Sequence, residues 1–101
     1  MIIHMTERVG VYGENKDIAR DIRISVILPS LEKNESIIID FRGVTGVTQS
    51  FIHALLADPI RKYPDAIFDL IMFKNCSESV QIIIETVEEY IQESLSDDWS
   101  E

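Results

Sequence analysis

Apolar residues follow two patterns along the chain: short unbroken runs, and longer stretches in which they recur about every four residues. The clearest short run is Ser36–Phe41, where three isoleucines stand between polar residues. This pattern predicts a strand whose isoleucines are buried on both faces, as in a parallel sheet covered by helices. Ala66–Phe73 predicts a second strand, and Ile2–Met5 a weaker third that pairs with Val9–Tyr12 as a hairpin.

The longer stretches predict three helices. They extend from about Asn15 to Leu31, from Thr48 to Tyr63, and from Ser77 to about Ser94. Pro29 and Pro59 have no backbone N–H to continue the helical hydrogen bonds. We therefore expect a kink or an end near the first proline and a break or bend at the second.

Each predicted helix presents an apolar face to the core. These faces comprise Ile18, Ala19, Ile22, Val26 and Ile27; Phe51, Ile52, Leu55 and Leu56; and Val80, Ile83 or Ile84, Val87 and Ile91. In the first helix, the charged residues are expected to face water: Lys16, Asp17, Arg20 and Arg23. Thr48 or Ser50 is the expected N-cap of the second helix.

Strands and helices alternate along the chain, which predicts an α/β fold with a mostly parallel central sheet of about four strands and about three helices. A chain of 101 residues has room for one hydrophobic core. We therefore expect one small domain over residues 1–94, followed by an acidic C-terminal tail over residues 95–101.

Charge is distributed unevenly. The net charge is −9, and residues 1–74 hold 10 acidic and all 9 basic residues, whereas residues 75–101 hold 8 acidic residues and no Lys or Arg. Binding to nucleic acid or to an anionic membrane requires clustered cations, so neither is an expected partner. A basic protein surface is the natural complement of the acidic end, and a second subunit of the same chain is one form such a partner takes.

The compartment is expected to be the cytoplasm. The single cysteine excludes an intramolecular disulfide. No apolar run approaches the roughly 20 residues that a membrane helix needs, and the first residues lack the basic-then-apolar pattern of a signal peptide.

One segment joins a buried strand, a glycine-containing turn and a helix start. It reads Asp40-Phe41-Arg42-Gly43-Val44-Thr45-Gly46-Val47-Thr48-Gln49-Ser50-Phe51-Ile52-His53-Ala54-Leu55-Leu56. The segment resembles the signature of STAS domains, the fold of anti-sigma-factor antagonists and of sulphate-transporter tails. It resembles more closely a short STAS-like family of bacterial and phage proteins without a settled function. The residues agree over 37–56, and the order of elements agrees over 15–91.

The resemblance implies a regulatory role for Ser50, which aligns with the serine that partner kinases phosphorylate in the antagonist proteins. Thr48, Gln49 and Phe51 stand where the family signature has an acid, a serine and a glycine. A serine in the first turn of a helix also lies near free N–H groups and the positive end of the helix dipole, which favour a phosphate. The alternative, that Ser50 is an ordinary helix-capping residue, remains open.

Other patterns in the chain do not indicate catalysis. His53 follows Ser50 by three residues, but no sequence motif supplies the orienting acid and oxyanion hole that a nucleophilic serine needs. His4 has no partner at metal-ligand spacing, and Cys76 is a lone thiol at the expected start of the third helix. The glycines form no phosphate-binding loop. We expect no enzyme activity, no metal and no cofactor.

Polar residues follow the carboxyl ends of the two clearest strands. Because the carboxyl ends of parallel strands meet at one edge of a sheet, these residues should be neighbours and form a partner-binding patch. They are Thr48, Gln49, Ser50, His53, Asn75 and Ser77.

These patterns favour a non-enzymatic module that docks a protein partner near Ser50. By the STAS resemblance, that partner is a kinase or ATPase of the anti-sigma type. The alternative is a small acidic inhibitor or decoy that blocks a basic surface through residues 85–101. Truncation after Leu95 separates the two hypotheses. It should spare docking near Ser50 and should damage inhibition through the acidic end.

Overall fold

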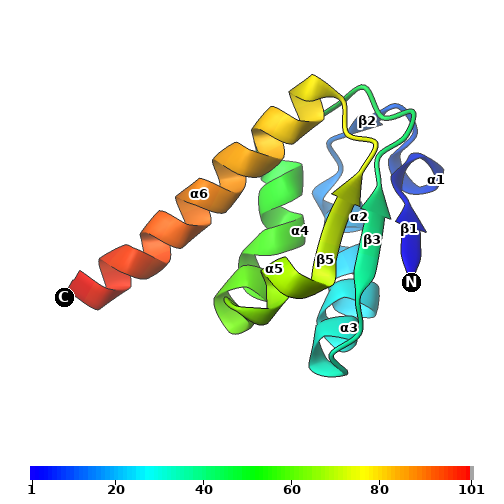
Figure 1. The fold of residues 1–101 in the computed structure, drawn as a ribbon. Coiled ribbons are helices and arrows are strands. Elements are labelled where there is room, and N and C mark those ends of the chain that lie inside the picture. Colours follow the sequence, from blue (N-terminus) through cyan, green and yellow to red (C-terminus); the bar gives the residue numbers. More distant parts are fainter. Residues whose placement is uncertain (101) are drawn as a thin grey trace.

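Two small parallel sheets and a layer of helices form the part of the chain that is described (Figure 1). The computed structural model describes the backbone of residues 1–100 and the side chains of residues 1–94. The strands are β1 (Ile2–His4), β2 (Tyr12–Gly13), β3 (Ile37–Asp40), β4 (Gly46–Val47) and β5 (Ile71–Lys74). The helices are α1 (Met5–Val9), α2 (Lys16–Ile22), the π-helical turn η1 (Arg23–Ile27), α3 (Leu28–Glu32), α4 (Gln49–Lys62), α5 (Ala66–Leu70) and α6 (Glu78–Ser100).

The central sheet has the strand order β1-β3-β5, and both pairs of neighbours are parallel. In the register, Ile38 lies between Ile2 and Met72. The remaining two strands, β2 and β4, pair with each other in parallel as a separate small sheet. The α/β class and the parallel sheet are thus confirmed, with three plus two strands in place of one sheet of about four.

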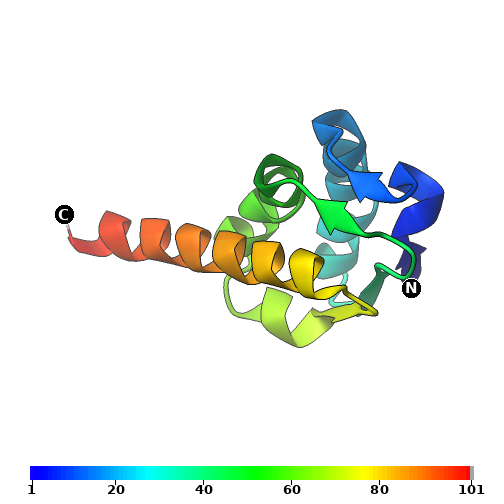
Figure 2. The same ribbon diagram turned by 90° about the horizontal axis from the view of Figure 1, so that it is seen from above.

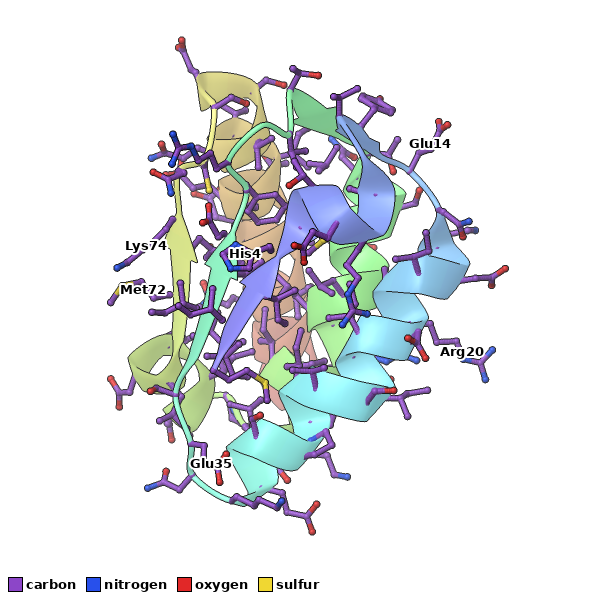
Figure 3. The ribbon with its side chains drawn as sticks, turned by 90° about the vertical axis from the view of Figure 1, so that its right-hand side faces the viewer. His4, Glu14, Arg20, Glu35, Met72 and Lys74 are labelled. Carbon is purple, nitrogen blue, oxygen red and sulfur yellow. The ribbon has the colours of Figure 1, made fainter. Side chains whose placement is uncertain are left out.

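Within the described residues, helices cover one face of the central sheet and leave the other face open (Figure 2). Ile37 and Ile39 point to the helices and are fully buried, whereas Ile38 is partly exposed on the opposite face. Its neighbours Ile2 and Met72 are 55% and 54% exposed, and Met72 points away from the helices in Figure 3. The expectation of a strand buried on both faces is therefore wrong. Strand order follows chain order, so right-handed crossovers place every connecting helix on the same side.

The N-terminal region forms a helix rather than the expected hairpin. Met5 is fully buried and Val9 is partly buried, and this four-residue spacing directs one helical face of α1 to the core. Gly10 ends α1 with a φ of 70°, a conformation that glycine adopts at little cost. The chain then places Tyr12–Gly13 beside Gly46–Val47, not beside β1.

The segment expected as a strand over Ala66–Phe73 is divided between two elements. Ala66–Leu70 forms helix α5, in which Ile67 is buried and Phe68 is 44% exposed, and strand β5 occupies only Ile71–Lys74. A short apolar run fits both periods, because Ile67, Leu70 and Ile71 also lie on one helical face.

Both helices that contain a proline continue past it. The first proline, Pro29, lies in the first turn of α3. Helices α2 and α3 are joined without a break by the π-helical turn η1, which ends just before it. The N–H of Leu28 donates to the carbonyl of Arg23, so the chain stays helical up to the proline, which donates no hydrogen bond itself. Helix α4 runs through Pro59 to Lys62 without the expected break, and α6 reaches Ser100, beyond the expected end near Ser94.

The core contains the predicted helix faces almost as expected. Fully or nearly fully buried are Ala19, Ile22, Ile27, Phe51, Ile52, Leu55, Leu56, Val80, Ile84, Val87 and Ile91. Arg23 departs from the prediction that it faces water, because its side chain is only 18% exposed. Its Nη1 donates to the carbonyl of Ala54 at 3.0 Å and lies 3.6 Å from Asp58 Oδ2, so it joins η1 to α4.

Candidate functional site

The small β2–β4 sheet positions the start of α4. The N–H of Thr48 donates to the carbonyl of Gly13 at 2.9 Å. A Cβ at Gly13 would lie 3.1 Å from Val47 Cγ1, a tight contact, so the absence of a side chain at this position favours the close approach of the two strands. Phe51, fully buried, anchors the first turn of α4 below them.

Thr48, rather than Ser50, is the N-cap of α4. The Thr48 hydroxyl accepts a hydrogen bond from the N–H of Phe51 at 3.1 Å, the usual capping contact. Ser50 is the second residue of the helix and is exposed, with its hydroxyl 3.3 Å from that of Thr48. Its hydroxyl is therefore open to solvent. It lies beside the N–H groups of the first helical turn, which have no carbonyl partner within the helix.

Ser50 lines a groove that we name the α4–α6 groove. It has a volume of about 520 Å³, and its walls come from α2, α4 and α6. The lining residues are Lys16, Gln49, Ser50, His53, Ala54, Thr86, Val87 and Tyr90. The ring of His53 packs against that of Tyr90 with 6.1 Å between their centres.

The groove combines a cation, hydroxyls and aromatic surface. Lys16 supplies the positive charge, and no Asp or Glu belongs to the lining among the residues whose side chains are described. Together with the N-terminus of α4, this favours a negatively charged group on or near Ser50. Sequence reasoning missed Lys16 and Tyr90, because only the folded chain brings three separate helices to one groove.

Asn75 belongs to a different cluster, which joins the carboxyl ends of the three central strands. Its side-chain amide donates to Asp40 Oδ1 at 3.0 Å, and the N–H of Arg42 donates to the same oxygen at 2.9 Å. His4 Nδ1 lies 3.6 Å from Asp40 Oδ2. The Asn75 hydrogen bond, followed by that from Arg42, lowers the pKa of Asp40. Asn75 has a positive φ of 56°, a conformation that asparagine tolerates better than most residues.

Ser77 is the capping residue of α6. Its hydroxyl accepts from the N–H of Val80 at 3.2 Å and donates to the carbonyl of Thr45 at 3.4 Å. The six residues expected to form one patch are thus divided. Gln49, Ser50 and His53 line the α4–α6 groove beside the cap Thr48, whereas Asn75 and Ser77 lie outside its lining.

Cys76 lies between these two residues and is partly buried. Burial, and then the nearby Asp40 carboxylate, raises the pKa of its thiol above the usual value. A thiol that stays protonated is a poor nucleophile.

Two absences hold for the part of the chain that the structure describes. Among them, no three His, Cys, Asp or Glu side chains gather in a group that could hold a metal ion. None of the described helices is both long enough and apolar enough to span a membrane.

Comparison with known proteins identifies a family for most of the chain. A family model described as a STAS-like domain of unknown function (DUF4325) matches residues 19–81, well over half of the sequence. The matched region runs from α2 to the first turn of α6. It includes all six residues expected to bind a partner. Comparisons with curated proteins and with solved structures gave no match.

Proposed function

The chain belongs to the family of STAS-like domains of unknown function, and from this premise we propose that it is a non-enzymatic regulatory module. Its role is to dock a protein partner at the α4–α6 groove. The partner class suggested by the STAS resemblance is a kinase or ATPase of the anti-sigma type. Docking at this groove uses Gln49, Ser50 and His53 from α4 and the exposed ring of Tyr90 from α6.

The observation that carries the proposal is the position of Ser50. It is exposed, it lies in the first turn of α4, and it shares a groove with Lys16. A phosphate on this hydroxyl would bring a charge of about −1.5 to −2 next to free N–H groups and a lysine, so the fold would accept it. The same charge would change the surface that a partner meets. Ser50 is therefore suited to act as a switch for docking.

A binding role also accounts for the neighbouring histidine. His53 packs its ring on Tyr90, and the groove lining among the described side chains contains no carboxylate to orient it as a base. Nucleophilic catalysis requires such an orienting group together with an oxyanion hole. An exposed aromatic ring such as that of Tyr90 is typical of protein–protein contacts.

Site-specific photo-cross-linking in the cells that make the protein tests the docking site. The photoreactive residue p-benzoylphenylalanine replaces Tyr90, which is 62% exposed in the groove. A matched variant carries it at Lys62, which is exposed at the far end of α4. We expect a discrete cross-linked protein from position 90 that is absent from position 62.

The same experiment is repeated with Ser50→Asp in the Tyr90 variant. Loss of the adduct, with thermal stability unchanged, supports a docking surface controlled by charge at Ser50. Adducts of equal intensity from positions 90 and 62, or no adduct at position 90, would contradict docking at this groove.

A second candidate is the acidic inhibitor or decoy. The observation in its favour is that α6 extends to Ser100 and projects beyond the other helices (Figure 1). Glu85, Glu89 and Glu93 are exposed along it. Truncation of the chain after Leu95 distinguishes the two candidates. If the groove is the docking site, the truncated chain should still give the cross-linked protein from position 90. If the acidic end of α6 is the docking site, the truncated chain should lose partner binding.

A further inference from the structure

Strand β5 leaves one edge of the central sheet unpaired among the described strands. It pairs with β3 on one side, and no other described strand lies on its other side. The carbonyl of Lys74 accepts from the N–H of Phe41, the residue that follows β3. Because successive residues of a strand turn their backbone groups to opposite sides, the N–H and C=O of Phe73 face the outer edge. Unpaired groups of this kind are a template for another strand.

A groove runs between this edge and α6, and we name it the β5–α6 groove. Its volume is about 540 Å³. The lining residues are Ile71, Met72, Phe73, Asn75 and Cys76 from β5 and the turn after it, and Gln81, Ile84, Glu85 and Glu88 from α6. The α6 residues that line it differ from those of the α4–α6 groove, so the two grooves flank α6 on different sides.

Negative charge in this groove has no compensating cation among the described lining residues. Glu88 is partly buried, and it also lines the apolar hollow formed by Leu56, Ile60, Ile67, Phe68, Ile71 and Phe73. Burial, followed by the neighbouring Glu85 carboxylate, raises the pKa of Glu88. A carboxylate held in apolar surroundings is costly unless a cation pairs with it. An occupant with a positive charge would supply that pair.

The two faces of the sheet determine which types of residue would suit a strand added beside β5. Ile71 and Phe73 pack toward the helices, whereas Met72 points to the open face (Figure 3). Side chains of an added strand would alternate in the same way. Those on the helix side would meet Glu85 and Glu88, and those on the open side would extend the exposed apolar row of Ile2, Ile38 and Met72.

We propose that the β5–α6 groove binds an extended segment of a partner protein, which adds as a fourth strand beside β5 and pairs a lysine or arginine with Glu85 and Glu88. This site lies outside the groove of the proposed function and does not depend on it. The segment alternates basic residues, whose aliphatic stems pack on Ile84, with apolar residues on the open face. A second copy of this chain is the less suitable occupant, because it carries the same carboxylates at the same edge.

The probe is a capped heptapeptide of alternating lysine and valine, titrated into the full-length ¹⁵N-labelled chain. We expect the amide signals of Phe73 and Ile84 to shift. The double variant Glu85→Gln/Glu88→Gln should weaken binding by about tenfold or more, whereas Glu89→Gln, which removes a charge from α6 outside the groove, should change it less than about twofold. Grouping the lysines and valines instead of alternating them should also weaken binding by about tenfold.

Two modified peptides separate strand addition from simple charge attraction. N-methylation of the peptide amides removes the donors that pair with β5, so it should abolish binding while leaving the charge unchanged. Equal binding of the methylated peptide would overturn the proposal, as would shifts confined to Ser50 and His53. Absence of any shift at millimolar peptide, or formation of a dimer through β5 in analytical ultracentrifugation, would also overturn it.

Discussion

The one-sided cover of the central sheet makes a specific prediction for two neighbouring residues of β3. Ile39 is fully buried against the helices, and Ile38 is partly exposed on the open face. Both positions lie in the same strand, with paired neighbours on each side, so replacement by alanine removes the same atoms and the same strand propensity from each. Any difference between the two variants in the free energy of unfolding therefore shows how well each face of the sheet is covered by other elements.

The size of the difference follows from what surrounds each side chain. Ile39→Ala leaves a cavity in a packed core, and such substitutions cost about 2–5 kcal/mol. Ile38→Ala removes a side chain that already meets water and leaves no closed cavity, so we expect a cost of about 1 kcal/mol or less. The two costs differ by at least about 1 kcal/mol, so at about 4–8 °C per kcal/mol for a domain of this size, Ile39→Ala should lower Tm by at least about 4–8 °C more than Ile38→Ala does.

Urea unfolding followed by far-ultraviolet circular dichroism measures both free energies of unfolding in the isolated chain. Similar m-values for the parent and both variants show that the comparison is valid. Equal costs at the two positions would refute the reasoning, because they would mean that both faces of the sheet are buried.

Three further predictions concern individual side chains of the site. Thr48→Ala should lower the free energy of unfolding by about 1 kcal/mol through loss of the α4 cap, whereas Ser50→Ala should change it by less than about 0.5 kcal/mol in the same urea assay. The lowered pKa of Asp40 stabilises the fold above the ordinary aspartate pKa of about 4, and this contribution disappears as pH falls below it. Acid unfolding of Asp40→Asn should accordingly depend less on pH than that of the parent; an identical profile would contradict the role of the cluster. The raised pKa of Cys76 predicts slower alkylation by iodoacetamide at pH 8 than for free cysteine, and faster alkylation would contradict it.

The sequence was most informative where a helix has a regular apolar face. The residues Val80, Ile84, Val87 and Ile91 recur at helical spacing and are buried as that spacing predicts. Short apolar runs were less informative, because Ala66–Phe73 satisfies both the helical and the strand period. Local pattern also does not reveal whether a second layer covers a sheet, so the partial exposure of Ile38 could not be predicted from the sequence.

The candidate site was predictable only in part. Ser50 and His53 were identified because they belong to one helix turn and one recognisable segment. Lys16 was not, since its place in the same groove depends on how α2 packs beside α4. Asn75 was expected beside Ser50 from the shared sheet edge, but its hydrogen bond with Asp40 holds it in a separate cluster. Long-range packing decided each of these outcomes.

The most direct test of the account is the affinity of the cross-linked partner, once purified, for the parent chain and two charge variants. Ser50→Asp adds a negative charge within the α4–α6 groove, and Gln92→Glu adds one at an exposed position of α6 outside it. Isothermal titration calorimetry should show a loss of about tenfold or more for Ser50→Asp and a change of less than about twofold for Gln92→Glu, with equal Tm values for all three chains. Equal affinity of Ser50→Asp and the parent would contradict docking controlled by charge at Ser50.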